Sequence, residues 1–223
     1  MIGREVTMCF VCCPSQQSPI DILTESVYQT SFSRRGLRIG YTNTVKAKVK
    51  PKDDEHFLVE FTPSPKQDIK LNDQTFYLLQ FHFHAYSEHW VDSCQFPMEM
   101  HIVNQNSNTG ELAVLGVLIE TENKKNKATH SGLITRDKYE DLPFTINTKP
   151  KDWLPKRSDQ YFRYEGSLTT PEFDETVSWL VFANPIVLPS AEIQLLRKYF
   201  GLDVRSPQPI NRRYVLSNTA SRA

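Results

Sequence analysis

Two histidines, His82 and His84, lie two positions apart in the run QFHFH, which is typical of an extended strand. Side chains two residues apart on a strand point to the same face, so the two imidazoles are expected to stand side by side. The next strand-like run, PMEMHIVNQ, carries His101. If the two runs pair antiparallel, three neutral imidazoles can hold one Zn²⁺ and leave the fourth tetrahedral position for water. The pattern therefore predicts a catalytic zinc centre.

Polar side chains share the faces of these histidines. Gln80 lies on the face of His82, and Glu99 lies on the face of His101. An amide or carboxylate oxygen can accept the second ring N–H of a metal-bound imidazole and so fix its tautomer. The alternative is that His-x-His is an ordinary, half-exposed stretch of strand. The third histidine and its acidic and amide neighbours favour the metal centre.

The elements that must position these residues are mostly strands. Short alternating apolar runs and 14 prolines predict a mainly β protein. One helix is expected over residues 190–200, with Ser190 as its cap and Gly201 at its exit. A second short helix is expected near residues 131–141, and an irregular connection over residues 147–159. The expected strands are VKAKVK (45–50), HFLVEF (56–61), TFYLLQFHFHAY (75–86), PMEMHIVNQ (97–105) and LAVLGVLIE (112–120).

Length and charge exclude several classes of protein. A chain of 223 residues fits one domain, residues 1–223, with a short N-terminal segment at 1–16 and a tail at 216–223. Its 26 basic and 26 acidic residues give no net charge to attract nucleic acid. No apolar run reaches the roughly 18 residues of a membrane span. The apolar run TMCFVCC (7–13) is a poor match to a signal peptide.

Eight ordered blocks resemble the α-class carbonic anhydrases. The resemblance implies a single-domain, twisted and mostly antiparallel ten-stranded sheet with a few short peripheral helices. It also implies a zinc enzyme that converts CO₂ and water reversibly to bicarbonate and a proton. The blocks, which run from residue 17 to about residue 215, are QSPIDI, QFHFH, SEHWVD, PMEMHIVN, LAVLGV, YEGSLTTPE, ETVSWLVF and SPQPINRR.

The same resemblance assigns roles to individual residues. His82, His84 and His101 match the zinc ligands, and Gln80 and Glu99 match their supporting acceptors. Thr169 matches the gatekeeper threonine, and Glu88 matches the glutamate that accepts its hydroxyl proton. Thr170 follows as a contact to bicarbonate. The residues that match the apolar CO₂ pocket are Val103, Val114, Leu168, Val177 and Trp179.

The chain departs from the family's pattern at the proton shuttle. The fastest members carry a histidine on the cleft wall ahead of a Glu-Phe pair. Here the run DEHFLVEF offers His56 or, aligned on VEF, Glu55. His56 is the better candidate, because an unperturbed carboxyl pKa near 4 is poorly matched to zinc-activated water. Without a shuttle, turnover is expected to be slower while the chemistry remains.

Three further departures concern the cleft rim and a disulfide. Only Ala85, Tyr86 and Ser87 separate His84 from Glu88, where many relatives have a longer loop. The short N-terminus lacks an aromatic stretch, so part of the cleft covering is expected to be missing or supplied by a partner. In secreted relatives a disulfide joins the position of Cys12 to that of Phe173, and here it cannot form.

These departures keep two readings open. The first is a carbonic anhydrase acting as an enzyme. The second is a carbonic anhydrase-like zinc-binding scaffold, or a subunit of a larger assembly, with little turnover. The intact ligand set and the pair Thr169 and Glu88 favour the enzyme. The missing disulfide and the absence of a clear signal peptide favour an intracellular or organellar site over secretion.

Overall fold

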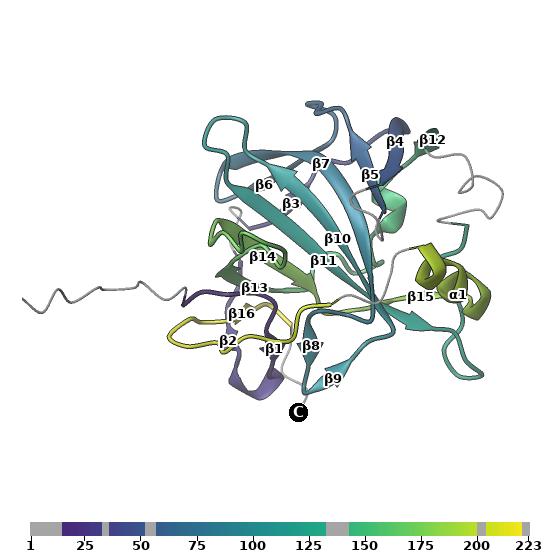
Figure 1. Cartoon of the computed structure of the whole chain (residues 1–223). Coiled ribbons are helices and arrows are strands. Elements are labelled where there is room, and N and C mark those ends of the chain that lie inside the picture. Colours follow the sequence, from purple (N-terminus) through teal and green to yellow (C-terminus); the bar gives the residue numbers. More distant parts are fainter. Residues whose placement is uncertain (1–14, 33–35, 52–56, 133–142, 200–203, 220–223) are drawn as a thin grey trace, which may run out of the picture.

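A large twisted sheet dominates the computed structural model, which describes residues 15–32, 36–51, 57–132, 143–199 and 204–219 (Figure 1). The strands and helices are short except at the centre of the sheet. In chain order they are β1 (Asp21–Ile22), η1 (Thr24–Ser26), β2 (Tyr28–Gln29), β3 (Arg38–Ile39), β4 (Val45–Pro51), β5 (Phe57–Phe61), β6 (Asp68–Leu71), β7 (Gln74–Ala85), β8 (Trp90–Val91), β9 (Cys94–Gln95), β10 (Met98–Gln105), β11 (Leu112–Thr121), β12 (Phe144–Thr148), η3 (Pro150–Trp153), β13 (Tyr161–Gly166), β14 (Val177–Phe182), β15 (Ile186–Leu188), α1 (Ser190–Tyr199) and β16 (Leu216–Ser217).

Ten strands follow one another across the main path of the sheet. Their order is β12-β4-β5-β7-β10-β11-β14-β13-β16-β2, while off this path β6 pairs with β7 and β3, and β15 pairs with β11. Strand β11 pairs parallel with β14 and β15, and β16 pairs parallel with β2. The other pairs of this sheet are antiparallel. The predicted mainly β, ten-stranded and mostly antiparallel sheet is therefore confirmed, and the single-domain assignment stays a prediction.

Strands β7 and β10 have the antiparallel register that the histidine pattern requires. His101 lies opposite His82, and Glu99 lies opposite His84. The register shifts further along the pair, because Val103 lies opposite Gln80 whereas the next residue, Asn104, lies opposite Leu78. Leu79 is the extra residue of a β-bulge. Leu79 lies three residues before His82, on the side away from the loop that leads to Glu88.

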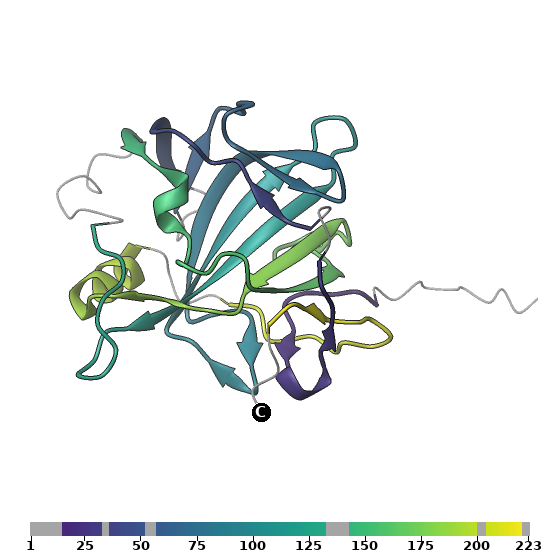
Figure 2. The ribbon, with the colours of Figure 1, turned by 180° about the vertical axis from the view of Figure 1, so that it is seen from behind.

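Two apolar cores cover the two faces of the sheet. Phe81 and Phe83 point into the larger core, where the ring of Trp153 from η3 lies 4.4 Å from that of Phe81. Figure 2 shows this face from behind, with the short η3 turn against the strands. The opposite face carries the histidines and a smaller core that includes Val114 and Trp179. The alternation of Phe and His in QFHFH thus divides one strand between a packed core and the site.

A small second sheet, β1-β8-β9, carries the segment that follows the histidine strand. Strand β1 pairs parallel with β8. The short turn before β8 is tied back to the start of β10, because the N–H of Tyr86 donates to Pro97 O at 3.3 Å and that of Ser87 to Phe96 O at 3.0 Å. The sequence patterns did not predict this sheet, because two-residue strands have no periodicity.

The helix α1 matches most of the predicted one. Ile193 and Leu196 are buried, as expected of its apolar side. The helix begins at Ser190, and Pro189 O accepts the N–H of Ile193, so Ser190 lies in the first turn and is not the cap. The expected end at residues 200–201 lies outside the described residues.

Two other predicted segments have mixed outcomes. Most of the helix expected near residues 131–141 lies outside the described residues. The expected irregular connection, residues 147–159, contains the end of β12 and the η3 turn. Within the part of the chain that the structure describes, no helix is long and apolar enough to span a membrane.

Candidate metal centre

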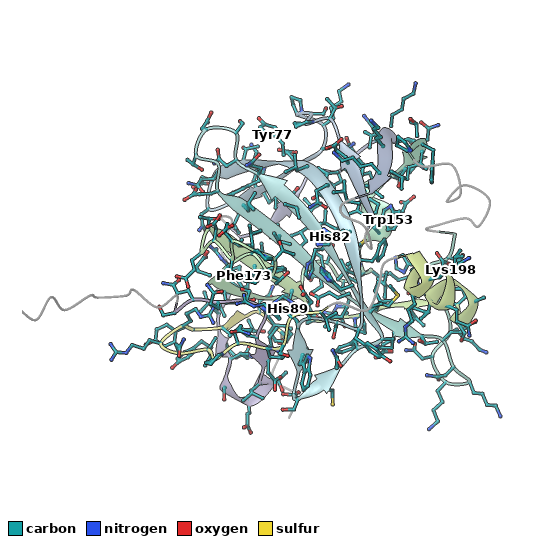
Figure 3. The ribbon with its side chains drawn as sticks, in the orientation of Figure 1. Tyr77, His82, His89, Trp153, Phe173 and Lys198 are labelled. Atoms are coloured by element: carbon teal, nitrogen blue, oxygen red, sulfur yellow. The ribbon has the colours of Figure 1, made fainter. Side chains whose placement is uncertain are left out.

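Three buried imidazoles meet where β7 and β10 pair. The ring centroids of His82 and His84 are 4.9 Å apart, and those rings lie 5.3 and 4.5 Å from the ring of His101. One nitrogen from each ring lies within 4.8 Å of the other two. Figure 3 labels His82 on the sheet that carries them. The predicted convergence of the three histidines is confirmed.

The rings of His82 and His101 are each oriented by a contact at one ring nitrogen, which leaves the other nitrogen for the metal. His82 Nδ1 lies 2.9 Å from Gln80 Oε1, so Nε2 would be the ligand atom of His82. His101 Nε2 lies 3.0 Å from Glu99 Oε1, so Nδ1 would be the ligand atom of His101. Amide and carboxylate oxygens that fix ring orientation in this way are typical of zinc sites. Three oriented, buried imidazoles fit Zn²⁺, for which neutral nitrogen is a preferred donor.

Glu99 is a fully buried carboxylate that accepts hydrogen bonds from several neighbouring donors. Its Oε2 accepts the main-chain N–H groups of Glu88 at 3.0 Å and His89 at 2.8 Å, and its Oε1 lies 2.8 Å from His89 Nδ1. Burial alone raises the pKa of Glu99, but His89 and His101 lower it by more, so the pKa lies well below the usual range. Gly116 leaves the necessary room, because a β-carbon there would meet Glu99 Oε1 at 3.0 Å.

His89 extends this network away from the metal position. Its Nε2 lies 2.7 Å from the hydroxyl of Tyr164, which is hydrogen-bonded to Ser18 Oγ at 2.9 Å. His89, Glu99 and His101 form a second cluster whose donor atoms are close enough for a metal. Glu99 already accepts four hydrogen bonds or close contacts, so it has little capacity left to bind a metal. The second cluster therefore serves to orient His101 in the three-histidine centre. Sequence reasoning assigned no role to His89, although it lies beside Glu88 in the block SEHWVD.

Glu88 lies at the edge of the centre. Its Oε2 is 3.6 Å from His84 Nε2 and 3.9 Å from His101 Nδ1, and its Oε1 accepts the main-chain N–H of Arg205 at 2.9 Å. Burial raises the pKa of Glu88, and His101, Thr169 and Arg205 partly oppose that rise. The Thr169 side chain lies close enough to Glu88 to lower its pKa, so the structure brings the predicted pair together. The sequence did not predict the contact of Arg205 with Glu88, because a main-chain N–H is present in almost every residue and leaves no pattern in the sequence.

The predicted pocket residues form an apolar wall beside the rings. Val114 pairs with Val103 on one side and with Trp179 on the other. The ring of Trp179 lies 4.8 Å from that of His101. Val103, Val114, Val177 and Trp179 are buried in the smaller core, and Leu168 packs against it.

Comparison with known proteins shows the family to which the chain belongs. The model of the family described as eukaryotic-type carbonic anhydrase matches residues 7–219. The chain belongs to that family. It is 34% identical over 208 residues to a carbonic anhydrase of Nostoc sp., covering 90% of this chain and 75% of that protein. It is 33% identical over 205 residues to the carbonic anhydrase of Neisseria gonorrhoeae, covering 90% and 76%.

Solved carbonic anhydrases share its fold. Carbonic anhydrase Cah3 from Chlamydomonas reinhardtii, solved with acetazolamide, superposes with a TM-score of 0.74 at 29% identity, covering 92% of this chain and 91% of that one. The α-carbonic anhydrase of Thermovibrio ammonificans, solved with sulfanilamide, gives 0.73 at 30% identity, covering 90% and 86%. This carbonic anhydrase is thus a zinc lyase, and CO₂ and bicarbonate are the substrates that its family implies.

Thr170, the expected contact to bicarbonate, lies in the loop between β13 and β14 of this carbonic anhydrase. Thr170 is partly buried beside Thr169, with its carbonyl accepting the N–H of Phe173. His56 and Glu55, the shuttle candidates, lie outside the described residues. Cys12 does too, and the ring of Phe173 lies against Arg205.

Proposed function

We propose that His82, His84 and His101 hold the zinc of this carbonic anhydrase and that the hydration of CO₂ takes place beside them. The observation that carries the proposal is the convergence of three buried rings, two of them oriented through their far nitrogens. When bound, zinc supplies an activated water with a pKa near 7 in well-studied enzymes, and so a nucleophile at neutral pH.

Thr169 and Glu88 orient that nucleophile in our proposal. Glu88 is acceptor-only when ionised, so it accepts a hydrogen bond that the Thr169 hydroxyl donates. The Thr169 oxygen can then act only as an acceptor towards the attacking water, and it directs a lone pair of that water at the substrate carbon. The contact between the two side chains and the main-chain N–H that Arg205 donates to Glu88 support these roles.

The apolar wall receives CO₂, and the polar rim receives bicarbonate. CO₂ has no charge and gains little from polar contacts, so an apolar surface beside the nucleophile suits it. The buried positions of Val114 and Trp179, with the latter ring against His101, support this assignment. Bicarbonate is an anion with hydroxyl character, and Thr170 offers it a hydrogen-bonding group. The wall is completed by Val103, Leu168 and Val177.

A stopped-flow CO₂ hydration assay tests the centre. The wild-type protein should contain one zinc per chain and hydrate CO₂ far faster than a double variant, His82→Ala with His84→Ala. Equal rates for the two proteins would refute the proposal. A wild-type protein that binds zinc at these histidines without turnover would instead support the scaffold reading, in which the chain serves a larger assembly.

The gatekeeper assignment has a separate test. Thr169→Ala should retain zinc and lose roughly 10²-fold in rate, the scale of losing one oriented transition-state contact. Thr62→Ala, at an exposed threonine, is the matched control and should match wild type. An unchanged rate for Thr169→Ala would show that Thr169 does not orient the nucleophile.

A further inference from the structure

One aromatic contact links the loop of Thr169 to the segment that holds Glu88. Arg205 Cζ lies 3.8 Å from the centre of the Phe173 ring. Phe173 belongs to the loop between β13 and β14 and is labelled in Figure 3. Its backbone has a positive φ of 62°, and its N–H donates to Thr170 O at 2.8 Å. The turn that presents Thr169 and Thr170 therefore closes directly onto Phe173.

Arg205 reaches the other member of the pair through its main chain. Its N–H donates to Glu88 Oε1 at 2.9 Å, while its Nη1 donates to Ser18 O at 2.8 Å. The guanidinium is thus fixed at one end to a buried serine, Ser18 being fully buried. Its flat face is covered by the Phe173 ring, a geometry that favours both stacking and cation–π attraction.

We propose that Phe173 is a positioning residue for the reaction, which sets the separation of Thr169 and Glu88 by stacking on Arg205. The contacts form a closed circuit from the Thr169 turn to Phe173, then to Arg205, to Glu88 and back to Thr169. The links from Phe173 N–H to Thr170 O and from Arg205 N–H to Glu88 are hydrogen bonds, and the last link is the side-chain interaction of Thr169 with Glu88. The proposal rests on the proposed function, since Thr169 and Glu88 must matter for their separation to matter.

The ring contact is the link that a side-chain substitution can remove selectively. The loop keeps its own main-chain hydrogen bonds, such as Leu168 N to Asp174 O at 3.0 Å, whatever residue occupies position 173. Gln17 Nε2 also binds Phe173 O at 3.2 Å, and a new side chain leaves that carbonyl in place. Leucine fills much of the same volume without a π-face, whereas tyrosine keeps the face.

The experiment compares kcat/KM for CO₂ hydration in zinc-loaded variants of the full chain. Phe173→Leu should lower kcat/KM by about twofold to tenfold, the range of one cation–π contact at a partly exposed site. Phe173→Tyr should restore a value close to wild type. Arg205→Lys keeps the charge and the main-chain N–H but loses the flat face, and should resemble Phe173→Leu. Zinc content should be equal in all variants.

A double variant separates positioning from general damage. If Phe173 acts through Thr169, Phe173→Leu should cause no further loss in a Thr169→Ala background, because coupled residues are non-additive. Tyr214→Leu removes an exposed ring stacked edge-on against Tyr28 and is the control, with wild-type kcat/KM expected.

The outcomes distinguish the two proposals. If Thr169→Ala is slow while Phe173→Leu equals wild type, the positioning role is wrong and the proposed function stands. Equal losses for Phe173→Leu and Phe173→Tyr, or an additive double variant, would also overturn the positioning role. An unchanged Thr169→Ala would remove the gatekeeper assignment on which the inference rests. If Phe173→Leu fails to fold, Arg205→Lys and Phe173→Tyr still decide the matter.

Discussion

The hydroxyl of Tyr164 lies 2.7 Å from Nε2 of His89, in the fully buried layer behind the metal centre. His89 in turn engages Glu99, whose Oε1 lies 3.0 Å from the zinc ligand His101. Tyr164 is also hydrogen-bonded to Ser18 of the block QSPIDI. A residue near the start of the described chain is therefore joined to a zinc ligand through a continuous line of buried side chains.

Tyr164→Phe should destabilise the protein by about 1–3 kcal/mol, because it leaves a buried ring nitrogen of His89 without its partner. Urea unfolding of the zinc-loaded protein measures the loss. Tyr214→Phe removes a hydroxyl from an exposed tyrosine and should change little. Equal unfolding free energies for both variants would show that the buried hydroxyl contributes nothing.

Glu99→Gln should weaken zinc binding by about 10-fold to 100-fold, the usual effect of changing a partner of a ligand histidine. The amide cannot accept all the contacts that Glu99 receives from His101, His89 and two main-chain N–H groups. Competition with a chelator of known affinity gives the zinc dissociation constant. Glu165→Gln, at a largely exposed carboxylate, serves as control. A wild-type dissociation constant in Glu99→Gln would contradict the assigned role.

His56→Ala should lower turnover in dilute buffer and recover when imidazole is added. An imidazole with an unperturbed pKa near 6.5 suits proton transfer from zinc-activated water. Steady-state rates across a range of buffer concentrations measure the effect. His130→Ala, at a histidine bound to Leu154 O, is the control. If His56→Ala and wild type respond identically to buffer, His56 is not the shuttle.

Acid should remove a stabilising contact at Glu175. Hydrogen bonds from Gln17 Nε2 at 3.0 Å and Gln16 N at 2.7 Å lower the pKa of Glu175 in the folded protein. A depressed folded pKa stabilises the fold above the unfolded value of about 4.3, and the gain is lost as pH falls through the folded pKa. Wild type should thus exceed Glu175→Gln in urea midpoint at pH 7, and the difference should shrink in acid. Glu172→Gln is the control. A difference in urea midpoint that stays constant with pH, or that equals the difference for Glu172→Gln, would contradict the stabilising role of Glu175.

The metal centre was predictable because strand geometry is simple. Side chains alternate along a strand, so His82 and His84 had to share a face, and an antiparallel neighbour could bring His101 to them. The observed register does this. Gln80 and Glu99 followed from the same alternation. The mainly β class followed from the apolar runs, and the ten-stranded sheet followed from the family resemblance.

Other parts depended on contacts that leave no periodic signal. Arg205 meets Glu88 through its main chain, and Phe173 meets Arg205 across a long interval of sequence. The small sheet β1-β8-β9 consists of two-residue strands, and His89 directly precedes one of them, β8. Such features arise from the tertiary arrangement, so one strand's pattern cannot specify them.

The extra residue Leu79 in β7 makes the two halves of that strand out of phase. Phe76 and Leu78 point into the same core as Phe81 and Phe83, although one pair is even-numbered and the other odd-numbered. Deleting Leu79 would restore an unbroken ladder of strand pairing between β7 and β10, but one half of β7 would then face the wrong side of the sheet. Either His82 and His84 would turn into the larger apolar core, or Phe76 and Leu78 would turn out of that core to the opposite face of the sheet. The length of this strand is consequently as much a determinant of zinc binding as the identity of its histidines.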